Sequence, residues 1–231
     1  MTETSARTAT SPRRRRRSVL RILLAAALGG VAVVAGSIAV SGYLEQQGLP
    51  TDMRGTPVRL AQPPQAVLAR IDAVDAANGL RLRVPQTGLD VPLGELNEVD
   101  GIIDPRGFSS AYLVRNYGAN LSNAATGTVF AVMHSCRGGA VCPGNYLIDV
   151  EAGTASTAIG ADVYLGGLHY RVTGSESVFK PDVRNAATVW DNRPGRLVLL
   201  TCLQVPEQTE SVDNLIITAE LVGGPGEGGP G

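Results

Sequence analysis

The chain has 231 residues, 44% of them hydrophobic, which is enough for one domain with accessory segments. Its formal net charge is −1, but the charges are unevenly distributed. Residues 1–41 contain seven arginines and one glutamate, whereas the remainder contains 13 basic and 20 acidic residues. The mildly acidic remainder argues against a nucleic-acid-binding domain, and an aromatic content of 4% argues against an aromatic stacking platform.

The N-terminus predicts a membrane anchor. Residues 1–18 are polar and end in the arginine run Arg13–Arg17, which predicts a cytoplasmic tail. Residues 19–41 include an uncharged apolar stretch from Ile22 to Val40, long enough to cross a bilayer. Arginines on one side only place the N-terminus in the cytoplasm. A cleavable signal peptide is the alternative, but its apolar core is usually shorter, about 7–15 residues. We therefore expect a single-pass membrane protein with an extracytoplasmic domain.

Three further segments follow the anchor. Residues 42–78 are rich in Gly and Pro and predict an extracytoplasmic spacer, with a short helix around 66–77. Residues 79–222 have the sequence pattern of a β domain. Residues 223–231 are almost entirely Gly and Pro and predict a disordered tail.

Within 79–222, short apolar or alternating runs are separated by Gly, Pro, Asn and Asp. The expected strands are 80–84, 128–133, 146–150, 162–165, 169–173, 196–202 and 214–222. Gly166-Gly167 marks a hairpin between two of them. Segments 116–125 and 182–190 are not strand-like. Such closely spaced runs favour an antiparallel barrel or sandwich.

Two of these runs end on chemically useful side chains. The run 196–202 ends on Thr201 and Cys202, and the run 129–133 is followed by His134. If the two strands are neighbours with the same sense, the thiol and the imidazole emerge at one rim, where an imidazolium would favour the thiolate nucleophile. The alternatives are a buried, inert thiol and a packed histidine. The other histidine, His169, is expected to be an exposed strand residue.

Cys136 and Cys142 lie shortly after His134. In an exported protein they could form a disulfide that stiffens this loop. A bond from either of them to Cys202 is the alternative and would mask the nucleophile. A metal site is disfavoured, because Cys-x5-Cys with one nearby histidine is not a usual zinc spacing. We expect no metal and no cofactor.

From about Leu80 to Val222 the chain resembles the sortases, the membrane-anchored cysteine transpeptidases of Gram-positive bacteria. The strand ending Leu199-Leu200-Thr201-Cys202 is similar to the family's TLxTC motif, and Val132-Met133-His134-Ser135 stands where the family has its strand-end histidine. The order of His before Cys, the anchor and the spacer also fit. The architecture and the arginine-rich composition look most like actinobacterial members, without assigning a subclass.

This resemblance implies a mainly β fold, a closed barrel of about eight strands with short helices, after the transmembrane helix. It implies that Cys202 attacks the Thr–Gly bond of an LPxTG-like sorting motif, and that a thioacyl enzyme passes the acyl group to an amine. His134 would be the general acid/base. The partners would be surface proteins with a C-terminal sorting motif and an amine acceptor, a cell-wall peptide or a pilin lysine.

The chain departs from the family in one respect. Sortases carry an arginine on the strand after the cysteine, where it helps to hold the substrate and the oxyanion, but no arginine follows Arg196 here. Asn214, Gln204 and Arg137 are the candidate substitutes, and Thr201 could support the oxyanion through its hydroxyl or backbone. The alternatives are therefore an active enzyme with a relocated donor, a slow or specialised enzyme, and a sortase-fold protein that only binds. An unrelated exported β domain with an incidental cysteine is a further alternative.

Overall fold

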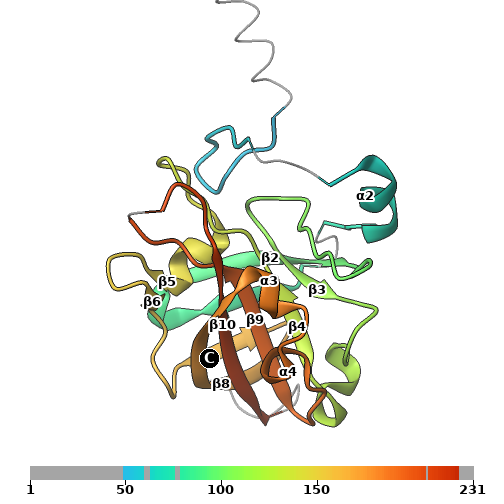
Figure 1. The fold of residues 1–231 in the computed structure, drawn as a ribbon. Helices are drawn as coiled ribbons and strands as arrows, with labels where there is room; N and C mark the ends of the chain where they lie inside the picture. The colour runs from blue at the N-terminus through green and yellow to red at the C-terminus, as the bar shows by residue number, and fades with distance from the viewer. Residues whose placement is uncertain (1–48, 60–62, 76–78, 207, 224–231) are drawn as a thin grey trace, which may run out of the picture. The chain divides into compact units, whose positions relative to one another are not determined.

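The structure is a computed structural model that describes residues 49–59, 63–75, 79–206 and 208–223 (Figure 1). The expected cytoplasmic tail at 1–18, the anchor at 19–41 and the tail beyond residue 223 lie outside these ranges. In the described ranges no helix combines the length and the apolar character needed to cross a membrane. The chain divides into two compact units after Leu49, and the strands and helices described here belong to the second, Pro50–Gly231.

Eight of the described strands close into a barrel, in the order β1-β2-β3-β4-β9-β10-β8-β7. This confirms the expected mainly β fold with a closed barrel of about eight strands. The barrel strands are β1 (Arg81–Val84), β2 (Leu89–Leu96), β3 (Ala111–Val114), β4 (Val129–Val132), β7 (Asp162–Leu165), β8 (Leu168–Phe179), β9 (Arg196–Cys202) and β10 (Asp213–Gly223). The strands β5 (Ile148–Asp149) and β6 (Thr154–Ala155) form a separate pair. The short helices are α2 (Gln65–Ile71), α3 (Lys180–Val183) and α4 (Ala187–Trp190), with 3₁₀ turns η1 (Pro85–Thr87), η2 (Leu121–Thr126) and η3 (Pro143–Leu147).

Two pairs of neighbouring strands run parallel, β2 with β3 and β4 with β9. The general expectation of antiparallel strands was wrong for β2 and β3, because the spacing of apolar runs does not show which runs are neighbours, whereas β4 and β9 are the same-sense neighbours that the hypothesis for His134 and Cys202 required. A parallel pair needs a long crossover. The chain provides one between β4 and β9 in residues 133–195, which include the β7–β8 hairpin.

Most of the expected strands are confirmed. Strand β9 has the predicted bounds, β4 and β7 lie within their predicted runs, and β8 continues past its predicted end to Phe179. Strands β2 and β3 were missed, and β2 contains a Pro and a Gly that usually weaken a strand. The run 146–150 is a strand only in part: it begins in the last two residues of η3 and contains the two-residue strand β5. The two segments expected not to be strands overlap η2 and the helices α3 and α4.

Strand β9 is buried on both faces, which explains its uninterrupted apolar sequence. Leu197 and Leu199 belong to the cluster that fills the barrel. Val198 belongs to a second cluster on the outer face, together with Ile71 of α2 and Val189 of α4. The outer face of the strand that ends at Cys202 is therefore buried in a cluster to which α2 and α4 both contribute.

The segment expected to be a spacer packs against the barrel. Asp52 is buried, and its carboxylate accepts hydrogen bonds from the backbone N–H groups of Thr56 and Val141. Tyr112 of β3 donates its hydroxyl to Asp75 at 2.8 Å. The expected boundary at residue 79 thus falls inside the compact unit that begins at Pro50.

A buried arginine joins α4 to the first residue of β9. Arg196 is 5% exposed. Its Nη1 donates to the carbonyls of Val189 at 3.2 Å and Asp191 at 3.1 Å, and its Nη2 donates to the carbonyl of Thr188. One side chain therefore satisfies the carbonyls at the end of α4 and holds that helix against the barrel.

Replacing Arg196 tests this role. Arg196→Met keeps much of the apolar stem but leaves the buried carbonyls without donors, so the free energy of unfolding should fall by about 2–4 kcal/mol. The matched control Arg193→Met, on an exposed side chain nearby, should change it by less than about 0.5 kcal/mol. Urea denaturation followed by the fluorescence of Trp190 measures both. Equal losses in the two variants would contradict the assignment.

Candidate active site

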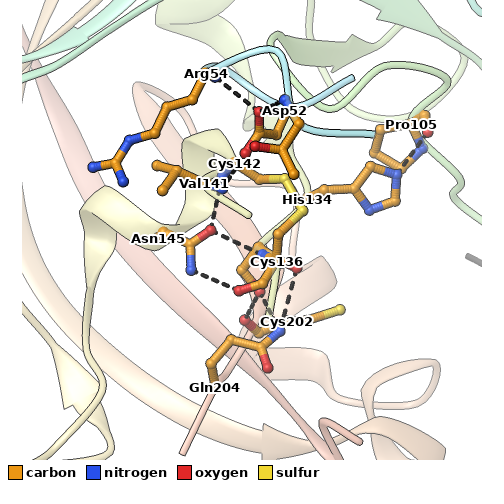
Figure 2. The surroundings of a disulfide bond; sticks show 12 residues. Asp52, Arg54, Pro105, His134, Cys136, Val141, Cys142, Asn145, Cys202 and Gln204 are labelled. Atoms are coloured by element: carbon orange, nitrogen blue, oxygen red, sulfur yellow. Dashed lines mark hydrogen bonds between the residues drawn. A yellow bond between two sulfur atoms is a disulfide. The ribbon is translucent and has the colours of Figure 1, made fainter. Parts of the chain in front are cut away.

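The ends of β4 and β9 bring His134 and Cys202 together. The two strands are parallel neighbours with Val132 opposite Leu200, and the backbone N–H of Met133 continues the ladder to the Leu200 carbonyl at 3.1 Å. His134 and Cys202 stand two residues beyond that pair, and side chains two residues apart on a strand share a face. In Figure 2 the thiol and the imidazole project to the same side.

Two hollows flank these side chains. The first, which we call the strand-side hollow, is lined by Val132, Trp190 and Leu200 among others. The second, the loop-side hollow, is lined by Pro57, Ser135, Arg137 and Gln204 among others. Four residues line both hollows: Asp104, His134, Lys180 and Cys202. A substrate that passes from one hollow to the other would cross the thiol.

Cys202 is half-buried and free, and its main chain is fixed by two polar neighbours. The Ser135 hydroxyl donates to the Cys202 carbonyl at 2.5 Å, and the Gln204 amide donates to the Ser135 hydroxyl at 2.8 Å. The Gln204 amide nitrogen also lies 3.2 Å from the Ser135 carbonyl. Gln204 is therefore engaged in holding the loop after His134, and its N–H groups are not turned to Cys202.

His134 is held by the loop before β3. Its Nε2 lies 2.8 Å from the Pro105 carbonyl, and its ring stacks on Phe108 with 4.6 Å between centroids. A carbonyl only accepts, so Nε2 carries a proton and the neutral ring keeps a lone pair on Nδ1. Burial lowers the pKa of His134 below its ordinary value of 6.5, against smaller opposing effects of the Pro105 carbonyl and Asp104. The neutral imidazole is thereby favoured, the form that can accept a proton.

Asp104 was not found from the sequence. Burial raises its pKa above the ordinary 3.8, and the charge of His134 opposes that shift. Asp104, Pro105 and Phe108 belong to a loop with no periodic pattern, and the Asp-Pro dipeptide in the sequence signals only a turn. Their proximity to His134 is a property of the tertiary structure.

A disulfide joins Cys136 to Cys142, with 5.4 Å between their Cα atoms, which settles the pairing that the sequence left open. Asn145 braces the loop that it closes: its Oδ1 accepts from the N–H groups of Cys136 and Cys142 at 2.8 and 2.9 Å (Figure 2). Its Nδ2 donates to the Cys136 carbonyl at 2.9 Å. The conformation of the residues directly after His134 is thus constrained by the disulfide and by the hydrogen bonds of Asn145.

The side chain of Thr201 faces away from the thiol. It alternates with Cys202 along β9, and its buried hydroxyl has no hydrogen-bond partner among the described residues. It packs against Gly144, where an added Cβ would lie 2.9 Å from the Thr201 Cβ and 2.8 Å from the His134 carbonyl oxygen. The structure therefore does not bring the Thr201 hydroxyl to the Cys202 face, and only its backbone is available there.

Asn214 and Arg137 are the other two candidate substitutes for the family's arginine, and they differ in whether a substrate can reach their side chains. Asn214 is directly opposite Cys202 in the β9–β10 ladder, so their side chains share a face, and it lines the strand-side hollow. Arg137 donates its Nη1 to the carbonyls of Val205, at 3.2 Å, and Gln208. Its Nε and Nη2 are buried without a hydrogen-bond partner in the described part of the chain. Asn214 is accessible to a substrate, whereas Arg137 braces the loop after β9.

The arrangement suits nucleophilic chemistry. A half-buried thiol, a histidine held neutral and an amide donor on the adjacent strand are the parts that acyl transfer requires. Among the described residues, no group of three or more His, Cys, Asp or Glu side chains could hold a metal ion.

No protein-family model matches the chain, and no curated protein does. Solved structures resemble it. Sortase A from Corynebacterium diphtheriae is 13% identical with a TM-score of 0.48, over 85% of this chain and 87% of that one. Sortase A from Listeria monocytogenes is 16% identical with a TM-score of 0.43, over 62% and 86%. Sortase C-1 from Streptococcus pneumoniae is 13% identical with a TM-score of 0.44, over 62% and 66%. The solved structures that the chain resembles include sortases of classes A, C and D, and the chain is assigned to none of these classes.

Proposed function

We propose that the chain is a cysteine transpeptidase that carries an acyl group as a thioester on Cys202. One observation carries the proposal: the free thiol and His134 stand at the ends of neighbouring parallel strands and line the same two hollows. A thiol next to a base in a half-buried site can split one difficult substitution into two easier ones.

The residues support two half-reactions. In the first, His134 takes the thiol proton, and the Cys202 sulfur attacks the carbonyl carbon of a peptide bond, whose oxygen becomes negative. When the C–N bond breaks, the imidazolium returns the proton to the departing amine, and the acyl group stays on sulfur. In the second, an incoming amine attacks the thioester carbon and gives its proton to His134, the C–S bond breaks, and the thiolate is reprotonated.

The substrate proposed is a C-terminal sorting motif of the LPxTG type, cut between Thr and Gly. The likeness of Leu199-Leu200-Thr201-Cys202 to the TLxTC motif supports this choice. The two hollows on either side of Cys202 suit an extended peptide that crosses the thiol. The acceptor would be an amine on the cell surface, from a cell-wall peptide or a pilin lysine.

The proposed location is the outer side of the cytoplasmic membrane. The apolar stretch at 19–41, flanked by arginines on its N-terminal side, would anchor the chain. The disulfide Cys136–Cys142 supports an oxidising compartment for the barrel, because disulfides are rare in the cytosol of most organisms.

Peptide transfer tests the proposed reaction. The full chain in detergent micelles, incubated with LPxTG- and LAxTG-type peptides and an amine, should give an amine-linked product detectable by mass spectrometry. Cys202→Ala should abolish the product, and His134→Ala should slow its formation by about 10²-fold or more. The control is His169→Gln, which removes the other histidine, paired with Asp162 on the β7–β8 hairpin, and should leave the rate unchanged.

Each outcome of this experiment is informative. Product formed by Cys202→Ala would contradict the nucleophile. Absence of both product and thioacyl adduct, with the Cys202 thiol shown to be titratable, would favour the alternative of a sortase-fold protein that only binds.

The protonation of His134 gives a second test. Burial disfavours the imidazolium, so His134 should titrate below pH 6.5 in the folded protein. Asp104→Asn removes a carboxylate that attracts the imidazolium, so the midpoint should move lower still. NMR titration of the imidazole Cε1–H signals measures both, and His169→Gln assigns the two histidines. A His134 midpoint above 6.5 would contradict this prediction, because it would show that the Pro105 carbonyl and Asp104 stabilise the imidazolium more than burial disfavours it.

A further inference from the structure

Acyl transfer at Cys202 would place negative charge on the substrate's carbonyl oxygen, and a preorganised positive donor at that point speeds such a reaction. The described residues bring several cations near the site, but one of them, Lys180, lines both hollows together with Cys202. Lys180 is also the only lysine of the chain, beside 19 arginines.

The strand register places Lys180 on the same face as Cys202. Cys202 is opposite Asn214 on β10, and Asn214 is opposite Val178 on β8. Side chains directly opposite each other in antiparallel strands share a face. Lys180 follows Val178 by two residues, and its backbone N–H donates to the Val212 carbonyl at 2.9 Å, which extends the β8–β10 ladder. The row across the three strands thus leads from Cys202 past Asn214 to Val178, and Lys180 lies two residues further along, at the start of α3. Figure 1 shows β9, β10 and β8 as the strands that carry this row.

The ammonium group of Lys180 is not used elsewhere. Lys180 is half-buried, yet in the described part of the chain it forms no ion pair and no side-chain hydrogen bond. The guanidinium of Arg137, in contrast, is bound to backbone carbonyls, and its remaining N–H groups have no exposed surface. Arg184 is exposed and lies against Gly101, and of the two hollows beside Cys202 it lines the strand-side hollow but not the loop-side hollow.

We propose that the Lys180 ammonium is the charged donor that binds the substrate carbonyl oxygen next to Cys202, with Asn214 as the neutral donor beside it. This inference rests on the proposed transpeptidase function. A lysine is suited to this place, because its ammonium is a compact charge with three donors on a flexible stem and can follow the oxygen as it becomes tetrahedral. Lys180 would then be a catalytic residue that comes from the β8–α3 junction.

The first experiment measures, without any peptide, how the positive charge of Lys180 affects the reaction of charged reagents with the Cys202 thiol. Cys202 of the full chain is modified with two methanethiosulfonates, one carrying a sulfonate and one a trimethylammonium group, and the ratio of the two rates is taken. The ratio cancels the thiolate fraction, because both reagents attack the same sulfur. Lys180→Met should lower the ratio of anionic to cationic rate by about fivefold, and Lys180→Arg should keep it within about twofold.

The second experiment measures thioacyl formation on Cys202 with the sorting peptide in single turnovers. Lys180→Met should slow this step by about 10²-fold with little change in KM, and Lys180→Arg should recover most of the rate. The control Arg171→Met removes one exposed cation from the far half of β8, where it pairs with Asp162, and should alter neither experiment. Lys180→Gln serves in place of Lys180→Met if near-UV circular dichroism shows that the latter is misfolded.

The outcomes separate this inference from the proposed function. An unchanged reagent ratio in Lys180→Met overturns the inference, whether or not the chain acts on peptides. A changed ratio with an unchanged thioacyl rate also overturns it, because the charge would then lie near the thiol without serving the oxyanion. If the native chain forms no thioacyl adduct with any sorting peptide, the proposed function fails and the role of Lys180 in that reaction fails with it, while the reagent ratio still reports its charge at the thiol.

Discussion

The parallel ladder between β4 and β9 is the constraint on which the site depends. It joins strands that are far apart in sequence, and its register places Val132 opposite Leu200. A strand turns every second side chain to the same face, so this register alone determines that His134 and Cys202 emerge together. A slip of one residue would turn the thiol into the barrel, where Thr201 now packs against Gly144.

Around this ladder the loops form a rigid support. The disulfide and Asn145 hold the residues after His134, and the Ser135 hydroxyl reaches across to the Cys202 carbonyl. The segment before the barrel takes part as well, since Asp52 accepts from the N–H of Val141 inside the disulfide loop. Sites held by packed and hydrogen-bonded neighbours keep their geometry better than sites on free loops.

Burial has opposite effects on the two titratable groups beside the thiol. It lowers the pKa of His134 and raises the pKa of Asp104, because in both cases the charged form loses hydration. The imidazole is thus kept available as a base, and the nearby carboxylate limits how far its pKa falls. Lys180 adds a positive charge to the same two hollows, and it comes from the end of β8, whereas His134 follows β4 on the opposite side of β9 in the strand order.

The amino-acid sequence by itself determined the strand that presents the thiol, the mainly β character and the choice of His134 and Cys202. An apolar run that ends in a polar or nucleophilic residue is a local pattern, so it can be recognised in the amino-acid sequence alone. Strand β2 was missed because its Pro and Gly weaken that signal. Which strands are parallel neighbours, where the Thr201 hydroxyl points and how Arg137 is bound were decided only by the tertiary structure. The same holds for the approach of Asp104 and Lys180, because contacts between distant segments depend on register and packing, which no local pattern encodes.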